Sequence, residues 1–315
     1  MEKSRKVTII GAGNVGATIA YSIMHTGIVS EILFIDINKD KAMGEAKDLM
    51  EGTAFCPPVI VRSGEYSDAE GSDIVIITSG AGRKPGQTRL DLAEGNIRIM
   101  KSIIPQIEQY AKDAIYIVVS NPVDILTYTF IKNLLNVPKN KVIGSGTMLD
   151  SSRLRNKISQ DLNINPQLVK ASIYGEHGDS AMVPWSLANI EGLSVESFYK
   201  RYNVPFNKEA ILKHVHTAGG EIIRLKGATF YAIGLSVANL VVQLIRGSRS
   251  IVTVSTLVDY PEVGEVCISV PCRVGMNGIE EVIMPELTKD EKEALKKSAI
   301  SMREVIDNTH AGKDE

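Results

Sequence analysis

A glycine-rich turn restricts the fold of this chain more than any other feature of its sequence. The string GAGNVG places Gly11, Gly13 and Gly16 in G-x-G-x-x-G spacing directly after an apolar run. The first glycine permits a tight turn, the second lets the backbone approach a pyrophosphate, and the third lets a helix pack on the strand. The turn therefore predicts that a helix amino terminus binds a dinucleotide here; the alternative is a turn needed for packing alone.

The second apolar run ends in an acidic residue that strengthens this prediction. Asp36 lies about twenty residues beyond Gly16, where a carboxylate can accept hydrogen bonds from both ribose hydroxyls of an adenosine. The same carboxylate would repel a 2′-phosphate, so the position favours NAD over NADP. An acidic residue that merely ends a strand is the alternative interpretation.

Short apolar runs alternate with helical patterns through the first half of the chain. The runs lack strict polar alternation, as expected of strands covered on both faces. They lie at 7–10, 32–35, 59–61, 74–77, 115–119 and 141–143. This order predicts an α/β fold built on a doubly wound, largely parallel Rossmann sheet.

The pattern changes in the second half, where long helical segments mix with alternating β stretches such as 169–173. Such a mixture is typical of α+β folds. We therefore expect an NAD-binding Rossmann domain at 1–144 and an α+β substrate domain at 145–315.

Composition limits the classes of partner. A chain of 315 residues with 44% hydrophobic residues can bury a sizeable core, and its net charge of −2 gives no general reason to bind nucleic acid or an anionic membrane. Its apolar runs are too short to span a bilayer. Three cysteines without CxxC spacing, and no signal-peptide pattern, favour the cytoplasm. The sequence contains no cluster of cysteine and histidine residues, so we expect no metal.

Three polar residues in the second half are candidates for catalysis. His177 lies in GEHGDS, where a loop would present its imidazole near the interior. Histidine suits general acid–base catalysis, although a lone histidine is often structural. Asp150 and Arg153 lie on one face of a predicted helix. They could pair with each other; alternatively, the carboxylate supports an imidazolium while the guanidinium binds a substrate carboxylate.

The motifs of the chain together resemble the lactate/malate dehydrogenase family over nearly its whole length, in the family's order and at its usual spacings. They are GAGNVGA, LFIDIN, TSGAGRKPGQTRLDL, SNPVDILT, GSGTMLDSSRLR, GEHGDS and KGATFYAIG. The resemblance implies a reversible hydride transfer between NADH and a small 2-oxo acid. It also implies a homo-oligomer, either a dimer or a tetramer.

The resemblance assigns catalytic roles to the residues at matching positions. It implies that His177 exchanges a proton with the substrate oxygen, and that Asp150 fixes its tautomer and raises its basicity. Arg153 would bind the carboxylate beside the reacting carbon. Arg89 would polarise the carbonyl as charge develops.

The resemblance also implies positions that bind substrate and cofactor. Asn121 would bond the substrate oxygen and the cofactor ribose, with a cis peptide bond before Pro122, and Thr229 would line the pocket. The implied cofactor-binding residues are Gly11, Gly13, Asn14, Val15, Gly16, Asp36, Thr78, Gly80, Ala81, Asn96, Ser120 and Asn121.

The identity of the acid depends on Arg83. Malate-specific members of the family have arginine at this position and lactate-specific members have glutamine, and a guanidinium can bind the second carboxylate of oxaloacetate. Pyruvate offers only a methyl group and would leave the cation unpaired. Thr229 and the run SIVTVSTLVD are more similar to bacterial lactate dehydrogenases. We expect malate and oxaloacetate, with L-lactate and pyruvate as the alternative.

Other hypotheses compete with these. A catalytically silent NAD-binding scaffold would have no physical reason to keep several converging polar groups. A metal-dependent glycosidase of similar fold would need metal ligands. Some bacterial family members are activated by a sugar bisphosphate at positions that resemble Arg155 and Lys170 here. The histidine usual at the second position is absent, so a solvated surface pair is the alternative.

Overall fold

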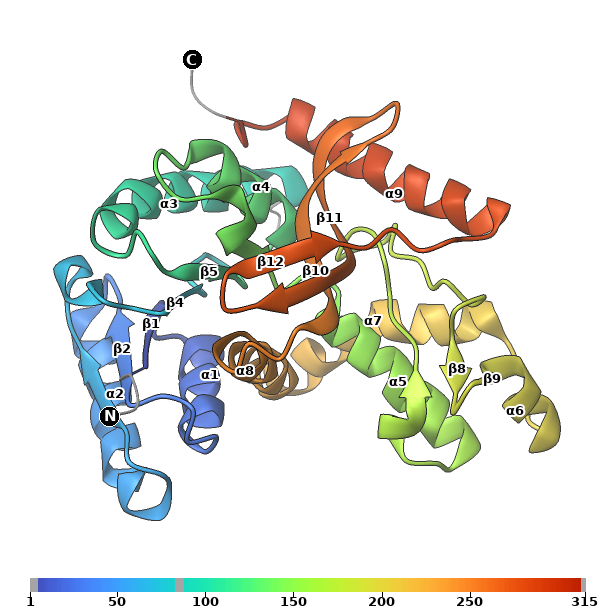
Figure 1. Ribbon diagram of the computed structural model, residues 1–315, viewed down its shortest axis with the longest axis horizontal. Coiled ribbons are helices and arrows are strands. Elements are labelled where there is room, and N and C mark those ends of the chain that lie inside the picture. Colours follow the sequence, from blue (N-terminus) through green and yellow to red (C-terminus); the bar gives the residue numbers. More distant parts are fainter. Residues whose placement is uncertain (1–4, 83–87, 313–315) are drawn as a thin grey trace.

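The structure, a computed structural model that describes residues 5–82 and 88–312, contains a large mixed sheet and a smaller sheet (Figure 1). Parallel strands form the first part of the large sheet, in the spatial order β6-β5-β4-β1-β2-β3. Their bounds are β1 (Lys6–Ile10), β2 (Glu31–Ile35), β3 (Ile60–Ser63), β4 (Ile74–Ile77), β5 (Ile115–Val118) and β6 (Val142–Gly144). This is the doubly wound Rossmann order, so the predicted fold class is confirmed.

Helices cover both faces of the parallel strands, which explains why these strands are apolar throughout. α1 lies on one side of them, and α3 and α4 lie on the other (Figure 1). α3 begins at a capping box in which Thr88 and Asp91 bond each other's backbone N–H groups. The helices of this part are α1 (Asn14–Met24), α2 (Lys39–Glu51), α3 (Arg89–Tyr110) and α4 (Val123–Asn133), with short 3-10 turns η1 (Gly52–Phe55), η2 (Tyr66–Ala69) and η3 (Lys139–Lys141).

The C-terminal part of the chain extends the same sheet with antiparallel strands, an arrangement that the sequence did not predict. Ser255 of β10 pairs with Gly144 of β6, so the open edge of the parallel strands is covered. The large core is therefore built from both ends of the chain. The elements are α8 (Tyr231–Ile245), β10 (Ser250–Tyr260), β11 (Gly264–Gly275), β12 (Gly278–Val282) and α9 (Lys289–Asp307).

A second, smaller core lies between α5 and α7, on the opposite side of the molecule from β1 and β2 (Figure 1). Its elements are α5 (Met148–Leu162), η4 (Pro166–Leu168), β7 (Val169–Lys170), β8 (Asn189–Ile190), β9 (Leu193–Ser194), α6 (Val195–Arg201) and α7 (Lys208–Lys226). The alternating run 169–173 forms a strand only at its start, because the N–H of Ile173 donates to the Ser151 hydroxyl instead. The boundary between residues 144 and 145 stays a prediction.

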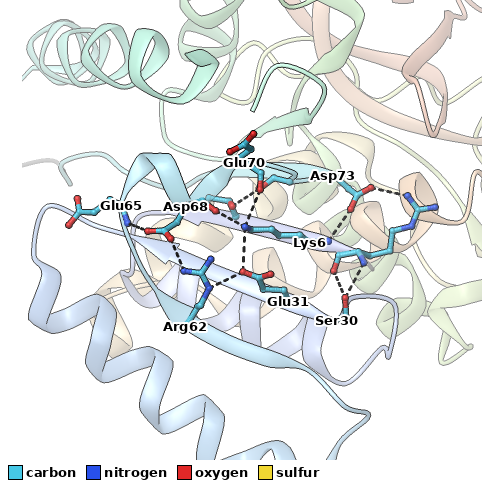
Figure 2. Close-up of polar contacts among 11 residues, drawn as sticks. Lys6, Ser30, Glu31, Arg62, Glu65, Asp68, Glu70 and Asp73 are labelled. Carbon is cyan, nitrogen blue, oxygen red and sulfur yellow. Dashed lines mark hydrogen bonds and ion pairs between the residues drawn. The ribbon is translucent and has the colours of Figure 1, made fainter. Parts of the chain in front are cut away.

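A network of charged side chains lies at the amino ends of β1 and β2 and reaches β3 and η2 (Figure 2). We call Lys6, Glu31, Arg62 and Asp68 the amino-end network. Lys6 Nζ lies 3.4 Å from Glu31 Oε1. Arg62 donates to Glu31 Oε1 at 2.9 Å and to Asp68 Oδ1 at 3.1 Å. Each cation therefore faces a carboxylate, and the ion pairs connect β1, β2, β3 and η2.

Within residues 5–82 and 88–312, every helix is too short or too polar to cross a bilayer. The same residues hold no group of three or more histidine, cysteine, aspartate or glutamate side chains that could bind a metal ion.

Candidate active site

The glycine-rich turn lies at the carboxyl end of β1 and leaves no room for a side chain at Gly11 or Gly16. Gly11 has a φ of 108°, in the region that favours glycine, and a Cβ there would lie 2.7 Å from Thr78 Oγ1. A Cβ at Gly16 would lie 2.0 Å from the carbonyl oxygen of Gly11. Helix α1 can therefore approach the turn this closely only because both residues are glycine.

The amino terminus of α1 is open to an anion. Gly13 is its N-cap, makes no side-chain capping bond and has open space beside its Cα. The first turn, which includes Asn14 and Val15, contains no acidic residue. Its N–H groups and the positive end of the helix dipole can therefore face the phosphates of a dinucleotide.

Asp36 is held at the carboxyl end of β2, beside the turn. Its Oδ2 accepts a hydrogen bond from the N–H of Ala12 at 2.6 Å, and its Oδ1 accepts one from the N–H of Asn38 at 2.8 Å. A glycine-rich turn, an open helix terminus and a carboxylate after the next strand fit the diphosphate and the adenosine ribose of NAD.

A cavity of about 1000 Å³ extends along the carboxyl ends of β4 and β5 and reaches α5, α7 and α9. Of the predicted residues, Val15, Thr78, Gly80, Ala81, Asn96, Ser120, Asn121, Asp150, Arg153, His177 and Thr229 line it. The structure thus brings cofactor-binding and catalytic candidates from both halves of the chain to one cavity. Arg83 lies outside the described residues, and Arg89 is the first residue of α3.

Hydrogen bonds from side chains fix the loops that follow β4 and β5. The Thr78 hydroxyl donates to the carbonyl oxygen of Gly11 at 2.8 Å. The Ser120 hydroxyl donates to the carbonyl oxygen of Ser79 at 2.6 Å. These two residues therefore hold the cavity wall together, and their contact with NAD stays a prediction.

Asn96 braces two loops at once. Its Oδ1 accepts from the N–H of Ala81 at 2.8 Å, and its amide nitrogen donates to the carbonyl oxygen of Asn121 at 2.7 Å. The peptide bond between Asn121 and Pro122 is cis, which confirms the prediction. Asn96 thus positions Asn121, and its own contact with NAD stays a prediction.

The catalytic candidates of the second half form one cluster. His177 Nδ1 lies 2.5 Å from Asp150 Oδ2, and Arg153 Nη1 donates to Asp150 Oδ1 at 3.0 Å. Asp150 therefore contacts both residues, since one oxygen faces the arginine and the other faces the histidine; substrate binding by Arg153 stays a prediction. With Nδ1 on the carboxylate, Nε2 is the nitrogen that can exchange a proton with a substrate oxygen.

Burial and charge act in opposite directions on this pair. Burial by itself would lower the pKa of His177, but the hydrogen bond and the charge of Asp150 outweigh burial and raise that pKa. Burial would likewise raise the pKa of Asp150, but His177 and Arg153 hold it below its usual value. The geometry therefore favours an imidazolium beside a carboxylate, which is the charge state that donates a proton.

A second carboxylate near His177 was not predicted. Asp124, in the first turn of α4, is 3% exposed, and its Oδ2 accepts a hydrogen bond from the backbone N–H of His177 at 2.7 Å. Burial raises the pKa of Asp124 to about 6, although the Ser255 hydroxyl and the His177 N–H oppose this rise. The sequence feature that could have identified Asp124 is an acidic residue within an otherwise apolar helical segment.

The N–H next to that of His177 is also held by a buried acceptor. Glu176 donates its N–H to the hydroxyl oxygen of Ser298 in α9, at 2.7 Å, and Ser298 is fully buried. Nothing in the sequence connects Ser298 with the GEHGDS loop. The loop is therefore held between α4 and α9 by one charged and one neutral acceptor.

Two adjacent glycines of α7 also belong to the site, although the sequence did not predict them there. A Cβ at Gly219 would lie 3.2 Å from Arg153 Nη2, whereas the space beside Gly220 is open. Both line the cavity together with Thr229. Glycine in a helix costs about 1 kcal/mol relative to alanine, so a glycine pair inside a helical segment was a usable signal. Its effect is to leave the cavity wide opposite Arg153.

The two positions considered for a sugar bisphosphate make separate contacts. Arg155 is half-buried in α5 and donates to the carbonyl oxygen of Ser151 at 3.2 Å, and burial lowers its pKa. Lys170 is exposed and donates to the carbonyl oxygen of Gln167 at 3.0 Å. Activation at these positions stays a hypothesis.

Comparison with solved structures supports the same fold. The minor L-lactate dehydrogenase from Enterococcus mundtii superposes with a TM-score of 0.91 at 37% identity, covering 97% of this chain and 98% of that one. A lactate dehydrogenase from a Medee basin deep-sea metagenome library gives a TM-score of 0.92 at 34% identity, covering 97% and 99%.

Sequence comparison covers nearly the whole chain. An L-lactate dehydrogenase of Clostridium botulinum is 46% identical over 96% of each chain, and L-lactate dehydrogenase 1 of Clostridium acetobutylicum is 45% identical over 98% of this chain and 99% of its own. Residues 5–144 match the NAD binding domain of lactate/malate dehydrogenase, and residues 147–312 match the alpha/beta C-terminal domain. The chain therefore belongs to the lactate/malate dehydrogenase family, and it is an NAD-dependent 2-hydroxy acid dehydrogenase.

Proposed function

We propose that the chain interconverts L-lactate and pyruvate. The observation that carries this proposal is its 46% identity, along 96% of the chain, with an L-lactate dehydrogenase. Thr229, which resembles the residue of bacterial lactate dehydrogenases, lines the cavity. The relatives lend no support to the preference for malate that Arg83 led us to expect.

Proton transfer is assigned to His177. Bound NAD supplies or accepts the hydride. In the direction of reduction, His177 donates the proton on Nε2 to the substrate oxygen, so that the oxygen does not carry a full negative charge. Asp150 holds Nδ1 and stabilises the imidazolium before transfer. In the direction of oxidation, the neutral imidazole accepts the hydroxyl proton.

Substrate orientation is assigned to Arg153. Asp150 holds its guanidinium from one side, and the absence of a side chain at Gly219 leaves room for it on the other. A guanidinium in a set orientation can bind a carboxylate through two parallel hydrogen bonds. The adjacent carbonyl would then lie in the cavity that His177 lines. Arg89 keeps the role of polarising that carbonyl.

Malate and oxaloacetate are the second candidate pair. Arg83 would match a second carboxylate by charge. Gly219 and Gly220 favour the same pair, because they leave space beside Arg153 that a longer acid could fill. These features compete with the likeness to L-lactate dehydrogenases, so the two acids have to be compared directly.

The test is the kcat/KM for NADH oxidation with pyruvate and with oxaloacetate, for the wild type and for Arg83→Gln. We expect the wild type to prefer pyruvate and the substitution to change that preference little. A preference for oxaloacetate of tenfold or more in the wild type, lost in Arg83→Gln, would establish the malate pair instead. Lys84→Gln, which removes the neighbouring charge, is the matched control.

We also propose that the chain forms a homo-oligomer, either a dimer or a tetramer. Large apolar side chains are exposed on the helices around the parallel sheet, including Met43, Met50, Phe55, Tyr231 and Leu235. A surface of this kind is stabilised by burial against another subunit. Sedimentation velocity tests the proposal, and a single species of monomer mass would contradict it.

We further propose a cytoplasmic location. Cys56, Cys267 and Cys272 are all free thiols, as expected in a reducing compartment. Fractionation of cells that express the full chain tests this proposal, and recovery outside the cytoplasmic fraction would overturn it.

A further inference from the structure

We propose that Lys226 is a positioning residue for substrate binding, which holds the turn between α7 and α8 through the faces of two aromatic rings. We call this turn, residues 227–230, the connector. The proposal rests on the proposed function, in which Thr229 lines the pocket for the 2-oxo acid. Lys226 lies outside the cavity lining, so it acts through the connector and not on the substrate itself.

The connector belongs to the wall of the cavity. Ile223, one turn before the end of α7, lines the cavity, and so does Ile233 in the first turn of α8. Thr229 lines it between them. The wall therefore passes from one helix to the other through the connector, and the position of Thr229 depends on how the two helix ends are held together.

Backbone contacts hold the ends of the connector but not its middle. Gly227 ends α7 with a φ of 85°, and its N–H donates to the carbonyl oxygen of Ile223 at 2.8 Å. Phe230 is the N-cap of α8 and makes no side-chain capping bond. Among the described residues, Ala228 and Thr229 have no hydrogen-bond partner. A contact that spans the connector would therefore restrict the segment that its own backbone leaves untethered.

The Lys226 side chain makes such a contact. Its Nζ lies 3.5 Å from the centroid of the Phe230 ring and 4.0 Å from the centroid of the Tyr231 ring. The two rings meet edge to face, with their centroids 4.5 Å apart. An ammonium group within about 6 Å of an aromatic centroid is attracted by the negative face of the ring. One cation thus joins the last residue of α7 to the start of α8.

A lysine in the last turn of a helix has a simpler explanation, because a cation there interacts favourably with the helix dipole. Arg224 lies in the same turn of α7 and is also exposed, so it has the same relation to the dipole. In the described part of the chain, only Lys226 of these two lies over aromatic rings. Arg224 therefore provides an internal control for charge at the end of the helix.

Four changes separate the charge from the contact with the rings. Lys226→Met keeps a long unbranched side chain and removes the cation. Arg224→Met removes the other cation of the same turn and is the matched control. Lys226→Arg keeps a cation that can stack on an aromatic face. A fluorinated phenylalanine incorporated in place of Phe230 keeps the shape of the ring and weakens its negative face.

The first measurement is hydrogen exchange, followed by mass spectrometry, in peptides that cover the end of α7 and the start of α8. The N–H groups of Gly227 and Gly234 are hydrogen-bonded at the two ends of the connector, so their exchange reports its opening. We expect Lys226→Met to raise this exchange by about threefold or more, and Arg224→Met to leave it unchanged. Peptides of α5 serve as the internal reference. No turnover is measured, so the result does not depend on which acid is the substrate.

The second measurement is the KM and kcat for the better of two acids, pyruvate or oxaloacetate. Lys226→Met should raise KM by about three- to tenfold, because substrate binding must then order the connector. It should change kcat by less than about twofold, since His177 and Arg153 lie on other segments. Lys226→Arg should restore most of the loss, and the fluorinated ring should raise KM in the same direction as Lys226→Met.

Unchanged hydrogen exchange in Lys226→Met would overturn the proposal. Equal rises of KM in Lys226→Met and Arg224→Met would also overturn it, because charge at the helix end would then explain both. A loss confined to kcat would contradict a role in substrate binding. If the wild type reduces neither pyruvate nor oxaloacetate, the proposed function fails, whereas faster exchange in Lys226→Met would still demonstrate the contact across the connector.

Discussion

Two charged clusters lie at opposite ends of the parallel strands, and they differ in what their charges face. In the amino-end network, each side chain meets an opposite charge, and its members are between 12% and 39% exposed. In the active-site cluster, the Asp150 side chain is 10% exposed and its two oxygens serve both Arg153 and His177.

A dense group of charges is not by itself a functional site. The amino-end network joins neighbouring strands, and a pair as exposed as Arg62 and Asp68, at 38% and 39%, contributes little energy. The active-site cluster lines a cavity, contains a titratable imidazole, and places Asp124 next to it with a pKa raised by burial. Shifted pKa values in a cavity are typical of functional sites, and none of the four residues of the amino-end network lines this cavity.

The largest expected effect is that of His177→Asn, which breaks the active-site cluster at its proton donor. We expect kcat to fall by at least about 100-fold, because general acid–base catalysis commonly contributes that much or more. NADH should still bind, which fluorescence titration measures beside steady-state kinetics. Substantial turnover in the variant would remove His177 from the mechanism.

A smaller effect is expected from Arg153→Lys, which keeps the charge and removes the planar pair of donors. The kcat/KM should fall by about 10- to 100-fold, mainly through KM, because a lysine cannot bind a carboxylate in two-pronged fashion. Arg62→Lys, the same change in the amino-end network, is the matched control and should leave both constants unchanged. A loss in kcat alone would contradict a role in substrate binding.

The smallest expected effects are on stability, and their pH dependence should differ between the two clusters. We compare the free energy of unfolding of the wild type with that of Asp150→Asn and of Asp68→Asn by urea titration from acid to alkaline pH. The N–H of Glu65 is the first cause that lowers the pKa of Asp68, with Arg62 as a further cause, and burial opposes both. The contribution of Asp68, at most about 1 kcal/mol, should therefore vanish only as the pH falls through its lowered pKa.

The contribution of Asp150 to the free energy of unfolding should diminish at both acid and alkaline pH. It falls on acidification through the lowered pKa of Asp150, and also as the pH rises through the raised pKa of His177, since the imidazolium is then lost. A part persists at alkaline pH, because Arg153 stays charged. Two outcomes would show that the clusters do not differ in this way. Either the contribution of Asp68 to the free energy of unfolding falls at alkaline pH, or the contribution of Asp150 does not.

Local patterns predicted the cofactor side of the molecule well. The turn at Gly11 and the acid at Asp36 could be found because each acts through the backbone next to it. The roles of Asp150 and Arg153 could not be decided locally, and only the family resemblance favoured catalysis. The structure shows why the choice was open, since the two oxygens of Asp150 meet both partners.

The contacts that the sequence did not predict join distant residues. Asp124 reaches His177 across 53 positions, and Ser298 reaches Glu176 across 122. No periodicity or spacing relates such residues. Their proximity follows from the order of strands in the sheet and from the return of the C-terminal helix over the loop.

The sequence by itself determined the Rossmann half and the cofactor class, because short motifs encode backbone geometry. Only the tertiary structure decided that β10 joins β6, that Gly219 leaves room for Arg153, and that Asp124 lies behind His177. These features depend on which distant segments share one buried space. The free energy of burial, rather than local preference, selects that arrangement.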